Sequence, residues 1–223
     1  MELKGSIAVV TGSSTGIGYH TARLLLEKGA EVYGLSRRAT AVRHDRFHWL
    51  QCDVTIAEEI DRAFDAVLER HGCVDILVNN AGFGLFGDLE TLQPDEWHRL
   101  LATNLTAVFL CTRRVIPSMK ARKRGMILNI GSVAGKRGFK GGAAYSATKF
   151  AINGLSESLM DDLREFGIRV SCVNPGSVET EFFDRAGMQP KKAMDPAHLA
   201  GFLVSIIELP DSMLPDQITV RPL

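Results

Sequence analysis

The sequence lacks an excess of charge of either sign. Its 223 residues include 26 Lys and Arg and 26 Asp and Glu, so the formal net charge at pH 7 is zero. Without a basic excess, nothing suggests that the whole molecule binds nucleic acid or a membrane surface. No uninterrupted apolar run approaches the roughly 18 residues that suggest a membrane span, and the first residues contain no long apolar segment typical of a signal peptide.

Paired cysteines are also absent. The four cysteines are Cys52, Cys73, Cys111 and Cys172, and no two of them form a C-x-x-C pair. Three of the four lie in apolar runs, which predicts buried free thiols rather than a disulfide framework. His44 and His48 are spaced four apart without an evident third ligand, which indicates solvated histidines rather than a metal site. We therefore expect no metal and a reducing, cytoplasmic environment.

Linkers, repeats and low-complexity tracts are missing too, and a hydrophobic content of 45% is enough for a packed core. Apolar β-branched runs alternate with helix-like segments along the whole chain. Strands are predicted within residues 6–12, 31–36, 47–54, 75–82, 126–132, 168–176 and 217–223, and helices within 16–28, 57–70, 94–121, 143–166 and 196–208. This alternation predicts an α/β fold, a single doubly wound Rossmann-like domain over residues 1–223, with a mainly parallel seven-stranded sheet covered by helices on both faces.

One connection in this pattern is too short for a packed helix. Only residues 37–46 join the second and third predicted strands. A parallel crossover normally takes a dozen residues or more and usually includes a helix. We expect a loop with at most a turn or two, which leaves part of one sheet face less covered.

A glycine-rich loop, TGSSTGIG, lies between the first strand and the first helix and contains Gly12, Gly16 and Gly18. Residues without a Cβ allow the backbone to approach a pyrophosphate, and the helix N-terminus supplies N–H groups and partial positive charge. Glycines in such a turn can also serve packing alone. Their place after the first strand of an α/β chain favours a nucleotide site.

Tyr145 and Lys149 are four residues apart in a helical segment, which places them on one helix face. A phenol with a pKa near 10 is a poor base at pH 7, and a nearby ammonium favours the phenolate. The pair is a candidate for proton transfer, and an ordinary tyrosine beside a solvated lysine is the alternative.

Two further polar residues stand in apolar surroundings. Ser132 ends a predicted strand, at the edge where open α/β sheets bind ligands, although a turn or helix cap would also use serine there. Asn104 lies inside an apolar helical run, so its amide must find hydrogen-bond partners, for either a structural or a functional reason.

Together these features resemble the short-chain dehydrogenase/reductase family, of the Tyr-x3-Lys type with a TGxxxGIG cofactor loop. The resemblance rests on the ordered set TGSSTGIG, NNAG at residues 79–82, Asn104, Ser132, Tyr145-x3-Lys149 and Pro175-Gly176. Each motif is modest alone, but the ordered set is specific and extends from Ile7 to Pro222.

The resemblance implies a catalytic tetrad. Tyr145 would be the general acid in reduction and the general base in oxidation, and Ser132 would hold the substrate oxygen near it. Lys149 would lower the tyrosine pKa and hold the nicotinamide ribose, and Asn104 would position a water that links Lys149 to solvent. The presence of all four argues against a non-catalytic relative.

The resemblance also implies a cofactor site. The positions that correspond to cofactor contacts in the family are Gly12, Ser14, Thr15, Gly16, Ile17, Gly18, Ser36, Arg37, Arg38, Asp53, Val54, Asn80, Ala81, Gly82, Tyr145, Lys149, Pro175, Gly176, Val178 and Thr180.

The end of the second strand indicates which cofactor is preferred. An acidic residue at this place accepts hydrogen bonds from the ribose 2′-OH of NAD, but here it is replaced by Ser36, followed by Arg37 and Arg38. Guanidinium groups suit phosphate oxygens, so NADP(H) is expected to be preferred and NAD(H) remains possible. Thr15 weakens this expectation, since some NADP enzymes place a basic residue there. An exposed basic loop is the alternative reading.

The expected activity is hydride transfer between nicotinamide and a small-molecule carbonyl or secondary alcohol. A cofactor-binding sensor or scaffold without turnover is the alternative, which a carbonyl panel would separate. Five phenylalanines fall in segments that surround the active site in relatives: Phe83, Phe86, Phe139, Phe182 and Phe183. They form an apolar pocket or belong to the core. No nucleic-acid or membrane partner is expected, and pairing of helices in relatives implies a homodimer or homotetramer, with Phe150, Leu155, Leu159 and Phe166 as interface candidates.

Overall fold

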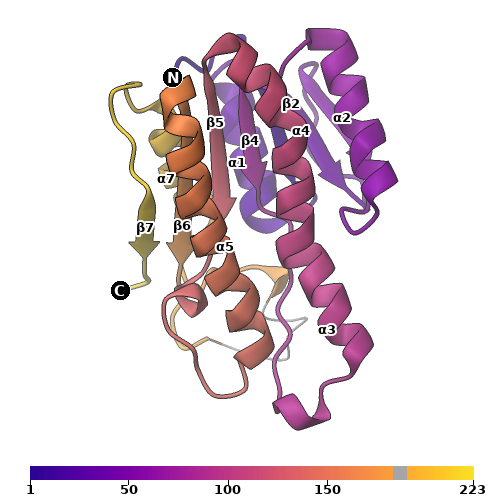
Figure 1. Cartoon of the computed structure of the whole chain (residues 1–223), viewed down its shortest axis with the longest axis vertical. Helices are drawn as coiled ribbons and strands as arrows, with labels where there is room; N and C mark the ends of the chain where they lie inside the picture. Colours follow the sequence, from indigo (N-terminus) through magenta and orange to yellow (C-terminus); the bar gives the residue numbers. More distant parts are fainter. Residues whose placement is uncertain (183–189) are drawn as a thin grey trace.

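The computed structural model describes residues 1–182 and 190–223, in which seven strands form one sheet (Figure 1). The strand order is β3-β2-β1-β4-β5-β6-β7, and all neighbouring strands pair in parallel. The strands are β1 (Ile7–Thr11), β2 (Glu31–Ser36), β3 (Phe47–Gln51), β4 (Ile76–Asn79), β5 (Gly125–Ile130), β6 (Ile168–Pro175) and β7 (Gln217–Val220). The predicted seven-stranded α/β fold is confirmed, and the described sheet is parallel throughout.

Helices cover both faces of the sheet. The longer ones are α1 (Gly16–Glu27), α2 (Ala57–His71), α3 (Pro94–Leu101), α4 (Ala107–Arg122), α5 (Ala143–Leu163) and α7 (Pro196–Glu208). The short ones are 3₁₀ turns at Leu89–Thr91, Val133–Gly135 and Arg164–Phe166 and a π-helical segment at Ala102–Thr106. In Figure 1, α4 and α5 cross in front of the sheet and α1 lies behind it.

Two apolar clusters fill the space between the helices and the sheet. Leu25 of α1 and Leu203 of α7 belong to the cluster on one face, whereas Phe64 of α2 and Val115 of α4 belong to the cluster on the other. Strands buried on both faces carry continuous apolar runs, such as the fully buried IAVVT of β1. This pattern explains why the strand positions were readable from sequence.

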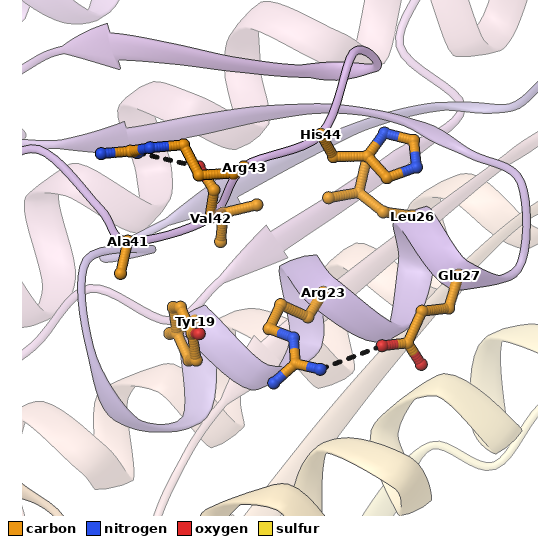
Figure 2. Close-up of a pocket in the computed structure, with 8 residues that line it drawn as sticks. All are labelled: Tyr19, Arg23, Leu26, Glu27, Ala41, Val42, Arg43 and His44. Atoms are coloured by element: carbon orange, nitrogen blue, oxygen red, sulfur yellow. Dashed lines mark hydrogen bonds and ion pairs between the residues drawn. The ribbon is translucent and has the colours of Figure 1, made fainter.

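The link between β2 and β3 contains only bends and turns over residues 37–46, as expected from its length. Without a packed helix, a groove of about 360 Å³ remains between α1 and the link. Figure 2 shows the side chains that line it, Tyr19, Arg23, Leu26 and Glu27 on α1 and Ala41, Val42, Arg43 and His44 on the link. The edge strand β3 is accordingly less buried than β1 or β2.

Buried amides tie the central strands to the helices. The Asn79 side chain donates to Thr112 Oγ1 at 3.1 Å and to Asn129 Oδ1 at 2.8 Å, and Asn129 donates to Ser156 Oγ at 2.9 Å. These bonds join β4 and β5 to α4 and α5. The helices that carry the candidate site are thus fixed to the sheet by polar contacts as well as by apolar packing.

The four cysteines are free and buried, as predicted. Within residues 1–182 and 190–223, no helix combines the length and the apolar character needed to cross a bilayer.

Candidate active site

The candidate site residues converge on the edge of the sheet where the parallel strands end. The glycine loop follows β1, Asn80 follows β4, Ser132 follows β5, and Thr180 follows β6. Tyr145 enters this edge from the first turn of α5. Open α/β sheets bind their ligands at this edge, because the loops after successive strands meet there.

The glycine loop has the backbone that its sequence suggested. Gly12 and Gly16 have φ angles of 68° and 58°, which L side chains rarely adopt. A Cβ on Gly12 would lie 2.9 Å from Ala81 Cα, and one on Gly18 would lie 2.4 Å from Gly12 O. Any side chain at these positions would push the loop away from β4, so glycine is required for the observed turn.

Asn80 connects the glycine loop to the end of β4 by hydrogen bonds. Its Nδ2 donates to the carbonyls of Thr11 at 2.9 Å and Gly12 at 3.1 Å, and Thr11 Oγ1 accepts from the N–H groups of Asn80 and Ala81 at 3.0 Å each. The side chain of Asn80 therefore shapes the loop. Gly82 continues the segment, where an added Cβ would meet Asn104 Oδ1 at 3.3 Å.

A dinucleotide phosphate fits the N-terminus of α1. Thr15 occupies the N-cap, and its side chain makes no capping hydrogen bond in the part of the chain that the structure describes. The first N–H groups of a helix then lack intrahelical partners and point at the loop, which is the arrangement that binds phosphate. Ser14 and Ile17 flank this position, and Ile17 packs against the core.

The segment after β6 approaches the glycine loop from the other side. A Cβ on Gly16 would lie 3.0 Å from Thr180 Cγ2. Gly176 N donates to Val220 O at 2.7 Å, and buried Val178 forms a parallel bridge with Met194. Pro175, the last residue of β6, precedes this turn. The segment after β6 thus reaches the glycine loop through Thr180.

Ser132, Tyr145 and Lys149 lie together and are nearly buried, with relative exposures of 9%, 7% and 7%. The Lys149 ammonium donates to Ile130 O at 2.8 Å and lies 5.8 Å from the centre of the Tyr145 ring. Ser132 caps the short 3₁₀ turn, where its Oγ accepts from Ala134 N at 3.1 Å.

Burial controls the acidity of this group. It raises the pKa of Tyr145 to about 12, against the opposing effect of a hydrogen bond with Ser132. It also lowers the pKa of Lys149 to about 8, against the favourable field of Cys172. The sequence predicted that Lys149 lowers the pKa of Tyr145. In this structure the pKa of Tyr145 is raised instead, because desolvation of the phenolate is the largest effect.

Asn104 lies in the π-helical segment between α3 and α4. Its side chain accepts from Phe83 N at 3.0 Å and donates to Phe83 O at 2.9 Å and to Thr148 Oγ1 at 3.4 Å. Thr148 in turn donates to Tyr145 O at 2.8 Å. The amide thus connects the loop after β4 with α5, and single π turns of this kind are frequent at functional sites.

A second amide pair was missed by the sequence reasoning. Asn174 of β6 and Asn153 of α5 exchange two hydrogen bonds, at 2.9 and 3.1 Å. Asn174 Oδ1 also accepts from Ser132 N at 3.1 Å, and Asn153 Nδ2 donates to Lys149 O at 3.0 Å. The pair therefore holds the backbone of two tetrad residues. Its only sequence signal was two polar residues at otherwise apolar positions.

The residues expected to select the cofactor lie at the end of β2 and just beyond it. Ser36 Oγ donates to Arg38 O at 2.7 Å and accepts from Trp49 Nε1 at 3.1 Å, so it fixes the turn. Arg37 is 71% exposed and lies 3.9 Å from Asp53 Oδ2. Val54, the next residue, is buried.

Arg38 forms a contact that the sequence did not predict. Its guanidinium pairs with Glu181 Oε2 at 3.1 Å. This ion pair joins the link after β2 to the segment after β6. Phe183, one of the five phenylalanines expected around the active site, lies with the rest of residues 183–189 outside the described residues.

The interface candidates on α5 and the 3₁₀ turn that follows it differ in exposure. Phe150 is 48% exposed, whereas Leu155, Leu159 and Phe166 pack partly against the apolar clusters of the chain itself. Phe109 on α4 is 49% exposed.

Comparison with known proteins agrees with this geometry. The family model described as short chain dehydrogenase matches residues 6–191. A 3-oxoacyl-[acyl-carrier-protein] reductase of Vibrio cholerae is 36% identical over 187 residues, which cover 81% of this chain and 77% of the relative. A 3-ketodihydrosphingosine reductase of Bacteroides thetaiotaomicron is 34% identical over 204 residues, or 92% and 76% of the two chains.

Solved structures are similar over nearly the full length. A metagenomic short-chain oxidoreductase in complex with NADP has a TM-score of 0.84 and 36% identity, and the match covers 100% of this chain and 99% of the other. A 3-ketoacyl-(acyl-carrier-protein) reductase from Brucella melitensis complexed with NADH has a TM-score of 0.89 and 30% identity, with 98% of each chain covered.

Proposed function

Because the chain belongs to the short-chain dehydrogenase family, we propose that it is an NADP(H)-dependent oxidoreductase that interconverts a carbonyl group and a secondary alcohol. The observation that carries this proposal is the convergence of Ser132, Tyr145 and Lys149 in a nearly buried cluster beside the glycine loop. When bound, the nicotinamide supplies or accepts the hydride.

Reduction suits the acidity of this cluster. A Tyr145 hydroxyl with a pKa of about 12 is protonated at neutral pH, so it is ready to donate its proton to a carbonyl oxygen. The Ser132 hydroxyl, which interacts with that of Tyr145, donates a second hydrogen bond to the same oxygen. After the transfer, the Lys149 ammonium stabilises the phenolate that remains. Oxidation uses the same group as a phenolate, which takes the proton of the alcohol.

The NADP preference rests on charge at the end of β2. No carboxylate occupies the position of Ser36, and Arg37 and Arg38 follow it with side chains that are 71% and 57% exposed. Exposed guanidinium groups can turn to a 2′-phosphate without losing a buried contact. The relatives of solved structure include one in complex with NADP and one with NADH.

The catalytic proposal is tested with Tyr145→Phe, which removes the proton donor and keeps the ring. We expect the variant to lose nearly all NADPH oxidation with a panel of aldehydes and ketones, while its affinity for NADPH changes little. Measurement of cofactor binding by fluorescence separates this outcome from misfolding. Substantial turnover by the variant would refute the role of Tyr145, and a wild-type protein that binds NADPH without turning over any carbonyl would favour a sensor or scaffold.

The cofactor proposal is tested with the ratio of kcat/KM for NADPH to that for NADH, with one common substrate. We expect a ratio well above one that falls in Arg37→Ala and falls further in the Arg37→Ala/Arg38→Ala variant. Arg23→Ala on α1 is the matched control, because it removes an exposed arginine that pairs with Glu27. An unchanged ratio in the double variant would mean that these arginines are surface charge.

We further propose a homodimer or homotetramer that buries Phe109 of α4 and Phe150 of α5, since large exposed apolar side chains on neighbouring helices favour a partner surface. A cytoplasmic location is proposed from the four buried free thiols.

A further inference from the structure

Three phenylalanines from three separate loops meet at the candidate general acid. Phe86 follows β4, Phe139 precedes α5, and Phe182 follows β6. The ring centres of Phe86 and Phe182 lie 5.3 and 5.6 Å from that of Tyr145, and 6.1 Å from each other. Phe139 extends this group, with its ring centre 5.6 Å from that of Phe86. We call these three residues the phenylalanine wall.

The rings of the phenylalanine wall pack directly against glycine backbone. A Cβ on Gly84 would lie 2.7 Å from both Phe182 Cζ and Phe86 Cε2, and a Cβ on Gly142 would lie 2.4 Å from Phe139 Cζ. The two glycines therefore make room for the rings. Behind Phe86 and Phe182 the cluster continues with apolar residues such as Leu100 and Trp97, which hold the rings in place.

The charged side chains of the segments that carry Phe86 and Phe139 lie on the surface. Asp88, Glu90, Lys136, Arg137 and Lys140 are all exposed. Beside Tyr145, the polar side chains identified above are the Ser132 hydroxyl and the Lys149 ammonium, and the latter is bonded to Ile130 O. Among residues 1–182 and 190–223, the contacts given for Tyr145 thus combine hydrogen-bonding groups for one oxygen atom with aromatic surface.

We infer that the substrate carries a flat apolar group on its carbonyl carbon, as an aryl ketone or aryl aldehyde does, and no charge beside the carbonyl. This inference rests on the proposed function and specifies its substrate class. Aromatic rings favour offset or edge-to-face contact with one another, and each such contact adds affinity beyond that of the buried area. A carboxylate beside the carbonyl would lose its hydration against the rings of the wall, which carry no charge to pair with it.

The test compares three ketones of similar size by NADPH oxidation: acetophenone, cyclohexyl methyl ketone and phenylglyoxylate, which bears the carboxylate. We expect kcat/KM for acetophenone to exceed that for phenylglyoxylate by about tenfold or more, and that for the cyclohexyl ketone by about threefold, the size of one aromatic contact. Equal values for all three, or a preference for phenylglyoxylate, would overturn the inference.

Variants of the phenylalanine wall test whether its rings cause the preference for acetophenone. Phe86→Leu keeps apolar bulk but removes the ring, so it should lower kcat/KM for acetophenone about threefold to tenfold and leave the cyclohexyl ketone within about twofold. Phe182→Leu should act in the same way, whereas Phe202→Leu, at a partly exposed ring on α7, should change kcat/KM for neither ketone. Thermal unfolding of each variant checks that it is folded.

The outcomes separate the inference from the proposed function. Turnover of all three ketones with ratios that Phe86→Leu and Phe182→Leu leave unchanged would overturn the substrate class and leave the reductase proposal standing. No turnover of any carbonyl compound by a wild-type protein that binds NADPH would overturn both.

Discussion

Replacement of the buried amide pair Asn153 and Asn174 should show strong energetic coupling. In Asn174→Leu, two buried groups lose their partners: the N–H of Ser132 and Oδ1 of Asn153. An unsatisfied buried group costs about 1–3 kcal/mol, so we expect this variant to lose about 2–6 kcal/mol of the free energy of unfolding. This is a large part of the 5–15 kcal/mol that is typical of a folded protein.

The double variant should be less damaged than the two single variants suggest. Asn153→Leu leaves Asn174 Nδ2 without its acceptor, but with leucine at both positions neither amide remains to be satisfied. Ser132 N and the carbonyl of Gly135 are then the groups left without these partners. We therefore expect the loss in Asn153→Leu/Asn174→Leu to be smaller than the sum of the single losses by about 2–6 kcal/mol, because Asn153 Oδ1 and Asn174 Nδ2 are both absent.

Urea denaturation with equal m-values measures these free energies. Asn174→Leu combined with Arg23→Ala on the exposed side of α1 is the control and should be additive. Losses that add within about 0.5 kcal/mol in the asparagine pair would show that the two amides do not depend on each other. NADPH oxidation by the folded variants should also show a lower kcat, because Ser132 loses its backbone anchor.

Three further predictions concern charge and assembly. Lys149→Met should raise the free energy of unfolding at pH 7 by about 3–4 kcal/mol, because the pKa of Lys149 falls from 10.5 to about 8 on folding and each unit corresponds to about 1.4 kcal/mol. The unfolded chain binds this proton more tightly, so the advantage of Lys149→Met should shrink between pH 8 and 10, and urea denaturation at pH 7 and 9.5 that gives equal differences would contradict the assignment. Glu181→Gln should lower KM for NADPH by about twofold to fivefold without changing KM for NADH, because Glu181 competes with the 2′-phosphate for Arg38 and this exposed ion pair is worth at most about 1 kcal/mol. Glu179→Gln is the control. An equal effect on KM for both cofactors would refute this competition for Arg38. Phe109→Glu/Phe150→Glu should be monomeric by light scattering at micromolar concentration, and a wild-type monomer would refute the proposed assembly.

The fold could be predicted from the sequence because its signals are local. Strands buried on both faces appear as continuous apolar runs, and the ten-residue spacing between β2 and β3 by itself excluded a packed helix. The glycine loop was readable for the same reason, since the positive φ of Gly12 and Gly16 requires a residue type that the sequence displays.

The missed features depend on contacts between distant residues. Asn153 and Asn174 are 21 positions apart, and Arg38 and Glu181 are 143 positions apart. Sequence periodicity reveals only contacts within one helix or strand, so it cannot predict either pair. The pKa of Tyr145 was misjudged for a related reason. The i,i+4 spacing with Lys149 is visible in the sequence, but the burial that raises the Tyr145 pKa involves Phe86 and Phe182, which follow two different strands.

The helix-free link between β2 and β3 also has a consequence for the order of folding. The ends of β2 and β3 are joined by ten residues, whereas 64 residues separate the end of β1 from the start of β4. Because the entropy of loop closure grows with the logarithm of loop length, joining β2 to β3 costs about 1.6 kcal/mol less than joining β1 to β4. The β2–β3 pair can therefore form early, although the poor burial of β3 gives it little stability by itself. In hydrogen exchange on the native protein, the amides of β3 should accordingly be among the first of the sheet to open and the quickest to close again.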